Sequence, residues 1–127
     1  MSVQTWTISE LAREFDVTPR TIRFYEDQGI VSPGRDGRQR VYGTRERTRL
    51  KLALRGKRLG LQLSEIRTLI DMYDSPRDTL SQLKHYREVL AAHRQTLEQQ
   101  RRDIEDVLAE ITQQEAQCAA LLRDHVL

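Results

Sequence analysis

The chain has 127 residues, of which 31% are charged and 6% aromatic, and its formal net charge is +2. This length allows one modest domain or a small domain with an extension, and the composition argues against a large globular core. No apolar run approaches the roughly 18 residues of a membrane span and no signal-peptide pattern precedes Trp6, so we expect a cytoplasmic protein without membrane association.

The first predicted element is a helix that ends near Phe15. Thr7 and Glu10, three residues apart, match a capping box, in which each side chain satisfies a backbone N–H at the helix start. Leu11 and Phe15 then lie four residues apart, as on one apolar helix face. Only two residues follow before the next helix signal, which predicts a tight turn.

A second helix of about ten residues is predicted to begin at Pro19. Thr18 is a favourable N-cap, Pro19 suits the first helical position, and Gly29 is typical of the residue just beyond a helix end. Arg20 and Arg23 lie three residues apart and therefore share a face, which suits a groove lined by phosphates. Two short helices joined this tightly outline a helix-turn-helix, although an ordinary helical hairpin has the same pattern.

A short basic β-hairpin, or wing, is predicted next, centred on the turn dipeptide Asp36-Gly37. Arg35 and Arg38 flank this dipeptide, and Tyr42 supplies an aromatic side chain through which the hairpin can pack. The alternative is a disordered basic loop.

Positive charge is concentrated in this half of the chain. Residues 1–60 carry 13 Lys or Arg against 7 Asp or Glu, whereas residues 61–127 carry 8 against 12. Within residues 20–58 the bias is 12 against 4. A solvated charged surface would show such a run, but its position beside a hairpin favours a phosphate-binding footprint.

Two further helices complete the predicted N-terminal domain. Thr44 is expected to cap a third helix that runs to about Leu59 and is ended by Gly60, with its arginines mostly outward. A fourth helix is expected to end near Asp74. The predicted fold is therefore mainly α, with a winged helix-turn-helix domain over residues 1–75.

Residues 76–127 are predicted to form one long helix with a short C-terminal tail. Ser75 and Pro76 match a helix start, and no Gly or Pro follows them. Apolar residues recur at intervals of seven, which indicates a coiled coil. A fold-back would need a turn, and none is visible before Thr112, so we expect a homodimer. The predicted dimerisation residues are Leu83, Leu90, Leu97, Ile104, Ile111 and Cys118.

The stretch TISELAREFDVTPRTIRFYEDQGIVSP, the basic hairpin and the long closing helix resemble the MerR family of bacterial transcriptional regulators. The resemblance covers essentially the whole chain, and Val17–Pro33 is highly specific for it. It implies that Phe24 packs between helix and wing and does not contact DNA, and that Trp6 lies in the core. The DNA-contacting residues that it implies are, for the major groove, Thr18, Arg20, Thr21, Arg23 and Tyr25; for the wing, Arg38, Arg40 and Tyr42; and for flanking phosphates, Lys57 and Arg58.

The resemblance also implies a mode of action. Such proteins are homodimers joined by an antiparallel coiled coil, and the periodicity by itself does not establish that strand direction. They bind double-stranded promoter DNA at a pseudo-palindromic operator and distort it on effector binding so that RNA polymerase can engage both promoter elements. Many also repress when unliganded.

The cysteine content of the chain and two of its segments indicate which kind of effector to expect. Metal-sensing relatives use several cysteines, whereas Cys118 is the single cysteine here, so we expect no bound metal or other cofactor. A metal-responsive regulator remains an alternative. The segments LRGKRLGLQLSEI and HRQTLEQQRRDIEDVLAEI are similar to a short-chain subgroup that regulates branched-chain amino acid and acyl-CoA catabolism. An effector of the acyl-CoA type is the resulting hypothesis.

A different class of function also fits the pattern, namely an architectural or adaptor protein that binds DNA and dimerises without responding to an effector. An enzyme is not supported. The sequence shows no nucleophile–base spacing, phosphate-binding loop or carboxylate pair in a plausible cleft.

Overall fold

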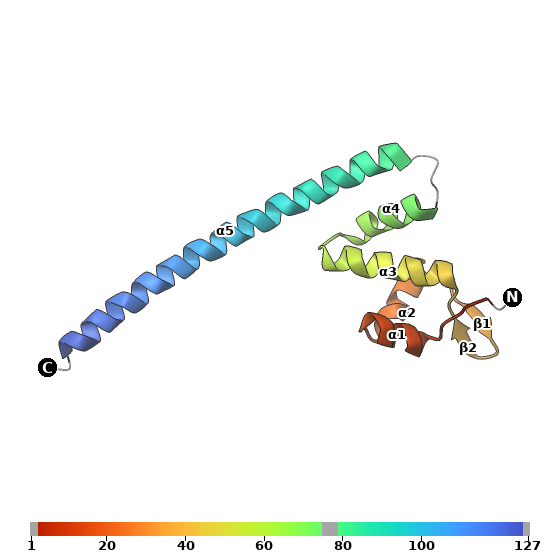
Figure 1. Ribbon diagram of the computed structural model, residues 1–127, viewed down its shortest axis with the longest axis horizontal. Helices are drawn as coiled ribbons and strands as arrows, with labels where there is room; N and C mark the ends of the chain where they lie inside the picture. The colour runs from red at the N-terminus through yellow and green to blue at the C-terminus, as the bar shows by residue number, and fades with distance from the viewer. Residues whose placement is uncertain (1–2, 75–78, 126–127) are drawn as a thin grey trace. The chain divides into compact units, whose positions relative to one another are not determined.

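The computed structural model describes residues 3–74 and 79–125 (Figure 1). The fold is mainly helical, with one antiparallel hairpin, as the sequence predicted. In chain order the elements are α1 (Ile8–Phe15), α2 (Pro19–Asp27), β1 (Gly34–Asp36), β2 (Gln39–Val41), α3 (Thr44–Arg58), α4 (Leu63–Asp74) and α5 (Thr79–His125).

The predicted capping box at the start of α1 is present. The backbone N–H of Thr7 donates to Glu10 Oε1 at 2.9 Å, and the backbone N–H of Glu10 donates to Thr7 Oγ1 at 3.1 Å. These two bonds satisfy donors that a helix start leaves without an intrahelical partner. The turn after α1 passes through Asp16, which adopts a left-handed conformation with φ of 54°.

The helices α2 and α3 both end at a glycine, and with the same hydrogen-bond pattern. Gly29 has φ of +75°, and the N–H of the next residue, Ile30, donates to the carbonyl oxygen of Tyr25 at 2.9 Å. Gly60 has φ of +85°, and the N–H of Leu61 donates to Gly56 O at 2.9 Å. Both are Schellman motifs, in which glycine takes a left-handed conformation at low cost.

The hairpin forms where it was predicted, but its turn lies one residue later. Asp36 pairs with Gln39, so the loop residues are Gly37 and Arg38 and not Asp36-Gly37. Gly37 has φ of +64° at the first loop position, where a two-residue loop of this kind favours glycine.

The start of α3 also differs from the expectation. Thr44 was expected as the N-cap, but it is the first helical residue, and Gly43 occupies the cap position without a side-chain hydrogen bond. Glycine is one of the residues that helix N-caps accept, although it has no side chain to bond the first N–H groups.

A single apolar core joins α1–α4 and the hairpin. Tyr42 is fully buried within it and pairs with Trp6 in an isolated β-bridge, with N···O distances of 2.8 and 2.9 Å. The buried apolar residues are Leu11, Ala12, Ile22, Tyr25, Ile30, Val31, Tyr42, Leu50, Ala53, Leu61, Ile66 and Ile70.

The long helix α5 contains 47 residues, which corresponds to about 70 Å at 1.5 Å per residue. Its first turns belong to a unit that extends to Val89, because Tyr86 and Val89 pack against the core. Residues from Leu90 onward form a second unit. The predicted helix start at Ser75 and Pro76, and with it the predicted domain boundary, lies outside the described residues.

Candidate nucleic-acid interface

The start of α2 is fixed by two threonines that were predicted to face DNA. The backbone N–H of Thr21 donates to Thr18 Oγ1 at 3.2 Å, and the two hydroxyl oxygens are 3.1 Å apart. Thr18 is exposed, Thr21 is partly buried, and the first turn contains no acidic residue. The positive end of the helix dipole therefore faces outward with a hydroxyl beside it, an arrangement that suits an anionic partner.

One face of α2 is exposed and carries both predicted arginines. Arg20, Arg23 and Phe24 lie within one helical turn, and all three are exposed. Ile22 and Tyr25 point the other way into the core. Neither arginine forms an ion pair with any residue of the described part of the chain, so both guanidinium groups are available to a ligand.

Two predicted DNA contacts, Tyr25 and Tyr42, lie in the core instead. The exposed fractions are 2% for Tyr25 and 0% for Tyr42, because both rings fill space among the helices and the hairpin. Burial raises the pKa of each phenol, and the charge of Glu26 raises that of Tyr42 further. Both tyrosine rings pack in the core, and they are not part of the exposed surface of the interface.

Phe24 was expected to pack between the helix and the wing and not to contact DNA, yet 49% of it is exposed. Trp6 was expected in the core and is partly buried against it, with the guanidinium carbon of Arg47 5.0 Å from the ring centroid.

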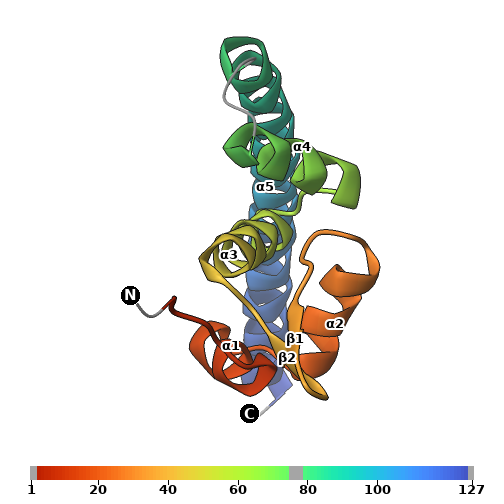
Figure 2. The same cartoon turned by 90° about the vertical axis from the view of Figure 1, so that its right-hand side faces the viewer.

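The wing lies beside α2 (Figure 2), and its arginines are not equivalent. Arg40 Nε donates to Glu26 Oε2 of α2 at 2.9 Å, which ties the hairpin to the helix. Arg35 is the cross-strand partner of Arg40, and Arg38 occupies the loop. Both Arg35 and Arg38 are exposed and have no ion pair within residues 3–74 and 79–125, so the unpaired positive charge of the wing lies at these two residues.

Lys57 and Arg58, which were predicted to reach flanking phosphates, are exposed in the last turn of α3. Cations in this position also interact favourably with the negative end of the helix dipole. The Schellman motif at Gly60 ends the helix directly after them.

A group of charged residues that the sequence did not single out holds the segment after α2. Glu46, only 8% exposed, accepts a hydrogen bond from the backbone N–H of Ser32 at 2.7 Å. Arg49 Nε donates to the carbonyl oxygen of Ile30 at 2.5 Å, and Arg49 also pairs with Asp74 at the end of α4. Because these partners lie 14 to 25 positions apart, no local pattern could have revealed them.

Arg47 is, like Arg49, an exception on α3, whose arginines were expected mostly outward. It pairs with Glu14 of α1, 33 residues away, and is only partly exposed. The hydrogen bond from Arg47 lowers the pKa of Glu14, and the same bond raises the pKa of Arg47. Arg45 binds Asp74 at 2.9 Å, and the charge of Asp74 raises the pKa of Arg45.

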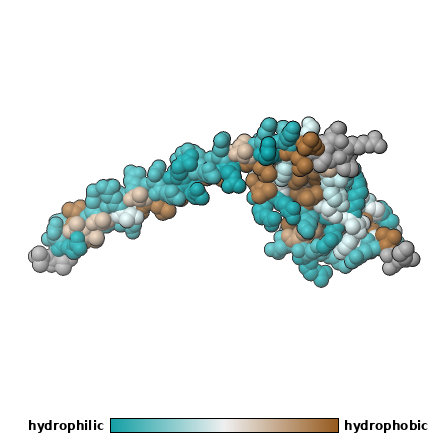
Figure 3. Space-filling view, turned by 45° about the horizontal axis from the view of Figure 1, so that its top comes forward, coloured by the Kyte–Doolittle hydropathy of each residue, from teal (hydrophilic) through white to brown (hydrophobic). Residues whose placement is uncertain are grey.

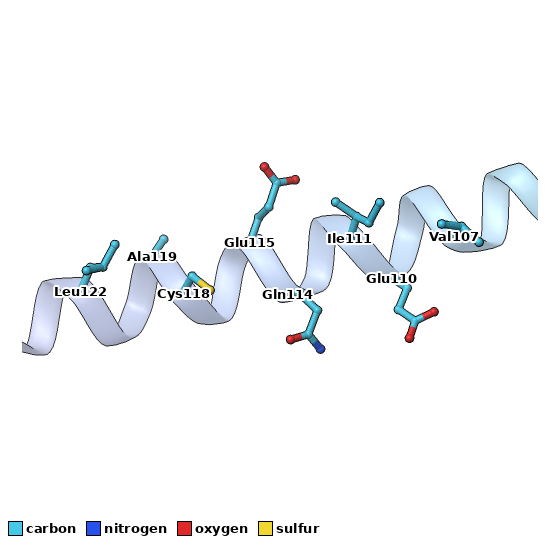
Figure 4. Close-up of a pocket in the computed structure, with 8 residues that line it drawn as sticks. All are labelled: Val107, Glu110, Ile111, Gln114, Glu115, Cys118, Ala119 and Leu122. Carbon is cyan, nitrogen blue, oxygen red and sulfur yellow. The ribbon is translucent and has the colours of Figure 1, made fainter.

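The predicted dimerisation stripe is largely exposed on α5. Leu90 is partly buried, and the other five positions, Leu83, Leu97, Ile104, Ile111 and Cys118, are exposed. Figure 3 shows brown patches on the otherwise teal helix, and Figure 4 shows Val107, Ile111 and Leu122 along it with Glu110, Gln114 and Glu115 between them. The surface between Val107 and Leu122 is lined by residues of this one helix alone.

Two further properties concern ligands and membranes. Within residues 3–74 and 79–125, no three His, Cys, Asp or Glu side chains are grouped so that they could hold a metal ion. None of the helices in the described part of the chain combines the length and apolar character that crossing a bilayer requires.

Comparison with solved structures finds the same fold in known regulators. The structure of HiNmlR, a MerR family regulator lacking the sensor domain, bound to promoter DNA, superposes with a TM-score of 0.61 over 83% of this chain and 79% of that one, at 20% identity. The transcription regulator PbrR691 from Ralstonia metallidurans CH34, in complex with lead(II), gives a TM-score of 0.53 at 27% identity, over 78% and 81% of the two chains.

Comparison of sequences finds regulators of the same kind. The chain is 31% identical over 72 residues to the HTH-type transcriptional regulator CueR of Salmonella typhi. The aligned region covers 55% of this chain and 52% of that protein. The chain thus spans about half the length of the curated relatives it matches. Residues 6–73 match the family model described as MerR HTH family regulatory protein, and residues 47–124 match the one described as MerR, DNA binding. The chain belongs to the MerR family of helix-turn-helix transcriptional regulators, which are not enzymes.

Proposed function

We propose that this chain is a sequence-specific transcriptional regulator that binds a pseudo-palindromic promoter operator as a homodimer. The observation that carries this proposal is the exposed face of α2, on which Arg20 and Arg23 lie free of ion pairs within the described residues. Such a helix fits the major groove, where arginine binds guanine edges and phosphates. Residues 1–75 would form the DNA-binding domain and residues 76–127 the dimerisation part.

The wing and the end of α3 would add phosphate contacts to those of α2. Arg35 and Arg38 are exposed on the wing and Lys57 and Arg58 at the end of α3, and none of the four has an ion pair among the described residues. Each phosphate contact releases counterions, so binding should weaken steeply as salt rises.

The homodimer is supported by the stripe on α5. A single recognition helix reads few base pairs, and dimers place two of them about one DNA turn, roughly 34–36 Å, apart. Leu97, Ile104 and Ile111 repeat every seven residues, and each is about half exposed. An antiparallel coiled coil of two copies would cover these side chains and separate the two DNA-binding domains.

We further propose that the dimer activates transcription by distorting operator DNA for RNA polymerase when an effector binds, and represses without it. Protein contacts that form only on bent DNA can offset the cost of deformation. An acyl-CoA-type metabolite is the effector that we propose to test first. The lead(II) complex of a relative at 27% identity supports including metal ions in the same tests. A promoter regulator acts where bacterial DNA lies, which is the cytoplasm.

The test is to select duplexes from a random-sequence library with the full chain, and then to measure binding of the selected duplex over a salt series. We expect a selected sequence with two-fold symmetry, and affinity that falls linearly on a log–log plot of salt. Arg23→Ala should weaken this binding, and Arg102→Ala, which removes the same charge from exposed α5, should not. Circular dichroism would verify that both variants are folded.

The contrasting function is an architectural or adaptor protein. Binding without any sequence preference would support that role and contradict ours. A promoter–reporter assay then tests the effector. The transcript level should change when an acyl-CoA or lead(II) is added. If neither changes it, the chain binds its operator but does not respond to these effectors.

A further inference from the structure

Phe24 is an exposed aromatic residue on the recognition face of α2. Arg20 precedes it by four residues, so the two side chains are neighbours on one helix face. Arg23 is adjacent in sequence and also exposed. The side chains that α2 buries, Ile22 and Tyr25, lie on the other side. Phe24 is therefore directed to the same partner as the two free arginines.

The ring of Phe24 packs against the buried ring of its neighbour Tyr25. It meets the ring of Tyr25 edge to face, with centroids 5.3 Å apart and an interplanar angle of 71°. Tyr25 is 2% exposed, so this contact gives Phe24 a fixed support while 49% of Phe24 stays open. An apolar group that is oriented in this way loses little conformational freedom when it binds.

The major groove offers such a ring one apolar feature, which is the C5-methyl group of thymine. The other base edges there present hydrogen-bond donors and acceptors that a phenyl ring cannot use. Phosphates and base-edge acceptors would be bound by the arginines beside it.

We propose that Phe24 contacts the C5-methyl group of a thymine in each half of the operator, and so contributes to sequence preference at that base pair. This inference rests on the proposed function, because it places the exposed face of α2 in the major groove. The free arginines give affinity and position, and Phe24 adds discrimination between thymine and bases without the methyl group.

The test replaces each thymine of the selected duplex with deoxyuridine, one position per half-site at a time, and measures binding of the full chain. Deoxyuridine keeps the hydrogen-bonding edge of thymine and lacks only its methyl group. At one position we expect binding to weaken about fourfold per half-site, the value for losing one buried methyl group. Phe24→Ala should bind thymine and deoxyuridine duplexes equally, and Phe24→Leu should retain part of the difference.

The matched control is Tyr73→Ala, which removes an equally exposed aromatic ring, 50% exposed, from a different helix, α4. It should retain the full sensitivity to deoxyuridine. Phe24→Gln replaces the ring with a polar side chain suited to an exposed helix position, and serves where the alanine variant does not fold.

Two results would overturn the inference. One is a wild-type protein that binds every deoxyuridine duplex as it binds thymine. The other is a Phe24→Ala or Phe24→Gln variant that weakens on all duplexes alike and still discriminates the methyl group, which would place the ring against deoxyribose. Failure to select any preferred duplex would instead contradict the proposed function, so the two failures are distinguishable.

Discussion

Glu46 of α3 accepts a hydrogen bond at Oε2 from the backbone N–H of Ser32, 2.7 Å away. Its other oxygen, Oε1, accepts from Arg45 Nη1 at 3.0 Å, so both oxygens of this nearly buried carboxylate are used. Ser32 lies between α2 and the wing. The bond therefore fixes the segment that sets the position of the wing relative to the recognition helix.

Glu46→Ala should destabilise the N-terminal domain. It leaves the N–H of Ser32 without its acceptor, at a cost of about 1–3 kcal/mol. The free energy of unfolding from urea titration measures this loss. Glu105→Ala, which removes an exposed carboxylate from α5, should change it by less than about 0.5 kcal/mol. Equal effects of the two substitutions would contradict a structural role for Glu46.

Gly56→Ala should also destabilise the domain, although alanine is the better helix former by about 1 kcal/mol. A Cβ at this position would lie 2.8 Å from Cγ1 of the buried Ile66 and 3.4 Å from Cδ1 of Leu61. The resulting strain of about 1–3 kcal/mol should exceed the gain in propensity. A double-mutant cycle with Ile66→Ala checks the cause, because the cost of the alanine should shrink when Ile66 is absent. Additive effects would rule out this contact.

The two wing arginines should differ in what they contribute. Arg38→Ala should reduce the salt dependence of operator binding by about one phosphate contact and leave the urea midpoint unchanged. Arg40→Ala should lower stability by about 0.2–1 kcal/mol, because it breaks the partly exposed ion pair with Glu26. Salt-dependent binding and urea unfolding of each variant give the comparison. If Arg40→Ala changes the salt dependence of binding and leaves the urea midpoint unchanged, Arg40 does not hold the wing against α2.

Leu97→Asp should dissociate the proposed dimer. Leu97 is 58% exposed in the single chain and occupies the middle of the seven-residue repeat, where a carboxylate would be buried without a partner in a coiled coil. Sedimentation equilibrium should show the mass of one chain. Gln95→Asp places the same charge nearly opposite on α5 and should leave the dimer mass unchanged. A Leu97→Asp protein of dimer mass would refute the proposed seam.

Stability should fall as the pH is lowered through the acidic range. Hydrogen bonds from Thr7 lower the pKa of Glu10, and the hydrogen bond from Arg47 lowers that of Glu14. A carboxylate with a lowered pKa in the folded state stabilises it above the unfolded value of about 4.3, and this contribution disappears as the pH falls through the folded value.

Urea midpoints measured from about pH 6 to about pH 3 would test this dependence. Glu14→Gln should flatten the curve, because the amide does not titrate. Glu10→Gln should flatten it too while retaining the cap, since glutamine also suits a capping box. Glu105→Gln on α5 is the control, and a curve of unchanged steepness in both test variants would contradict the assignment.

The interface was only partly predicted from the sequence. Arg20 and Arg23 are exposed because Ile22 and Tyr25, three residues apart on α2, share the face that packs on the core. The expectation, taken from the family resemblance, placed Phe24 between the helix and the wing and Tyr25 against DNA. The spacing of Ile22 and Tyr25 instead agrees with the buried Tyr25 and the exposed Phe24 of the structure.

The sequence alone determined the features that depend on neighbours within a few residues. The cap at Thr7, the glycine-terminated helix ends and the seven-residue repeat of α5 all arise from local backbone preferences and periodic apolar positions. The positive charge of the first 60 residues is likewise a property of composition.

Only the tertiary structure decided which charges remain free. Arg40 is paired with Glu26 across 14 residues and Arg47 with Glu14 across 33, whereas Arg20 and Arg23 meet no carboxylate among the described residues. These pairings depend on how α1, α2, α3 and the hairpin pack around one core. Sequence spacing carries no record of such distances, so the division of this basic surface into paired and unpaired arginines emerges only when the chain is folded.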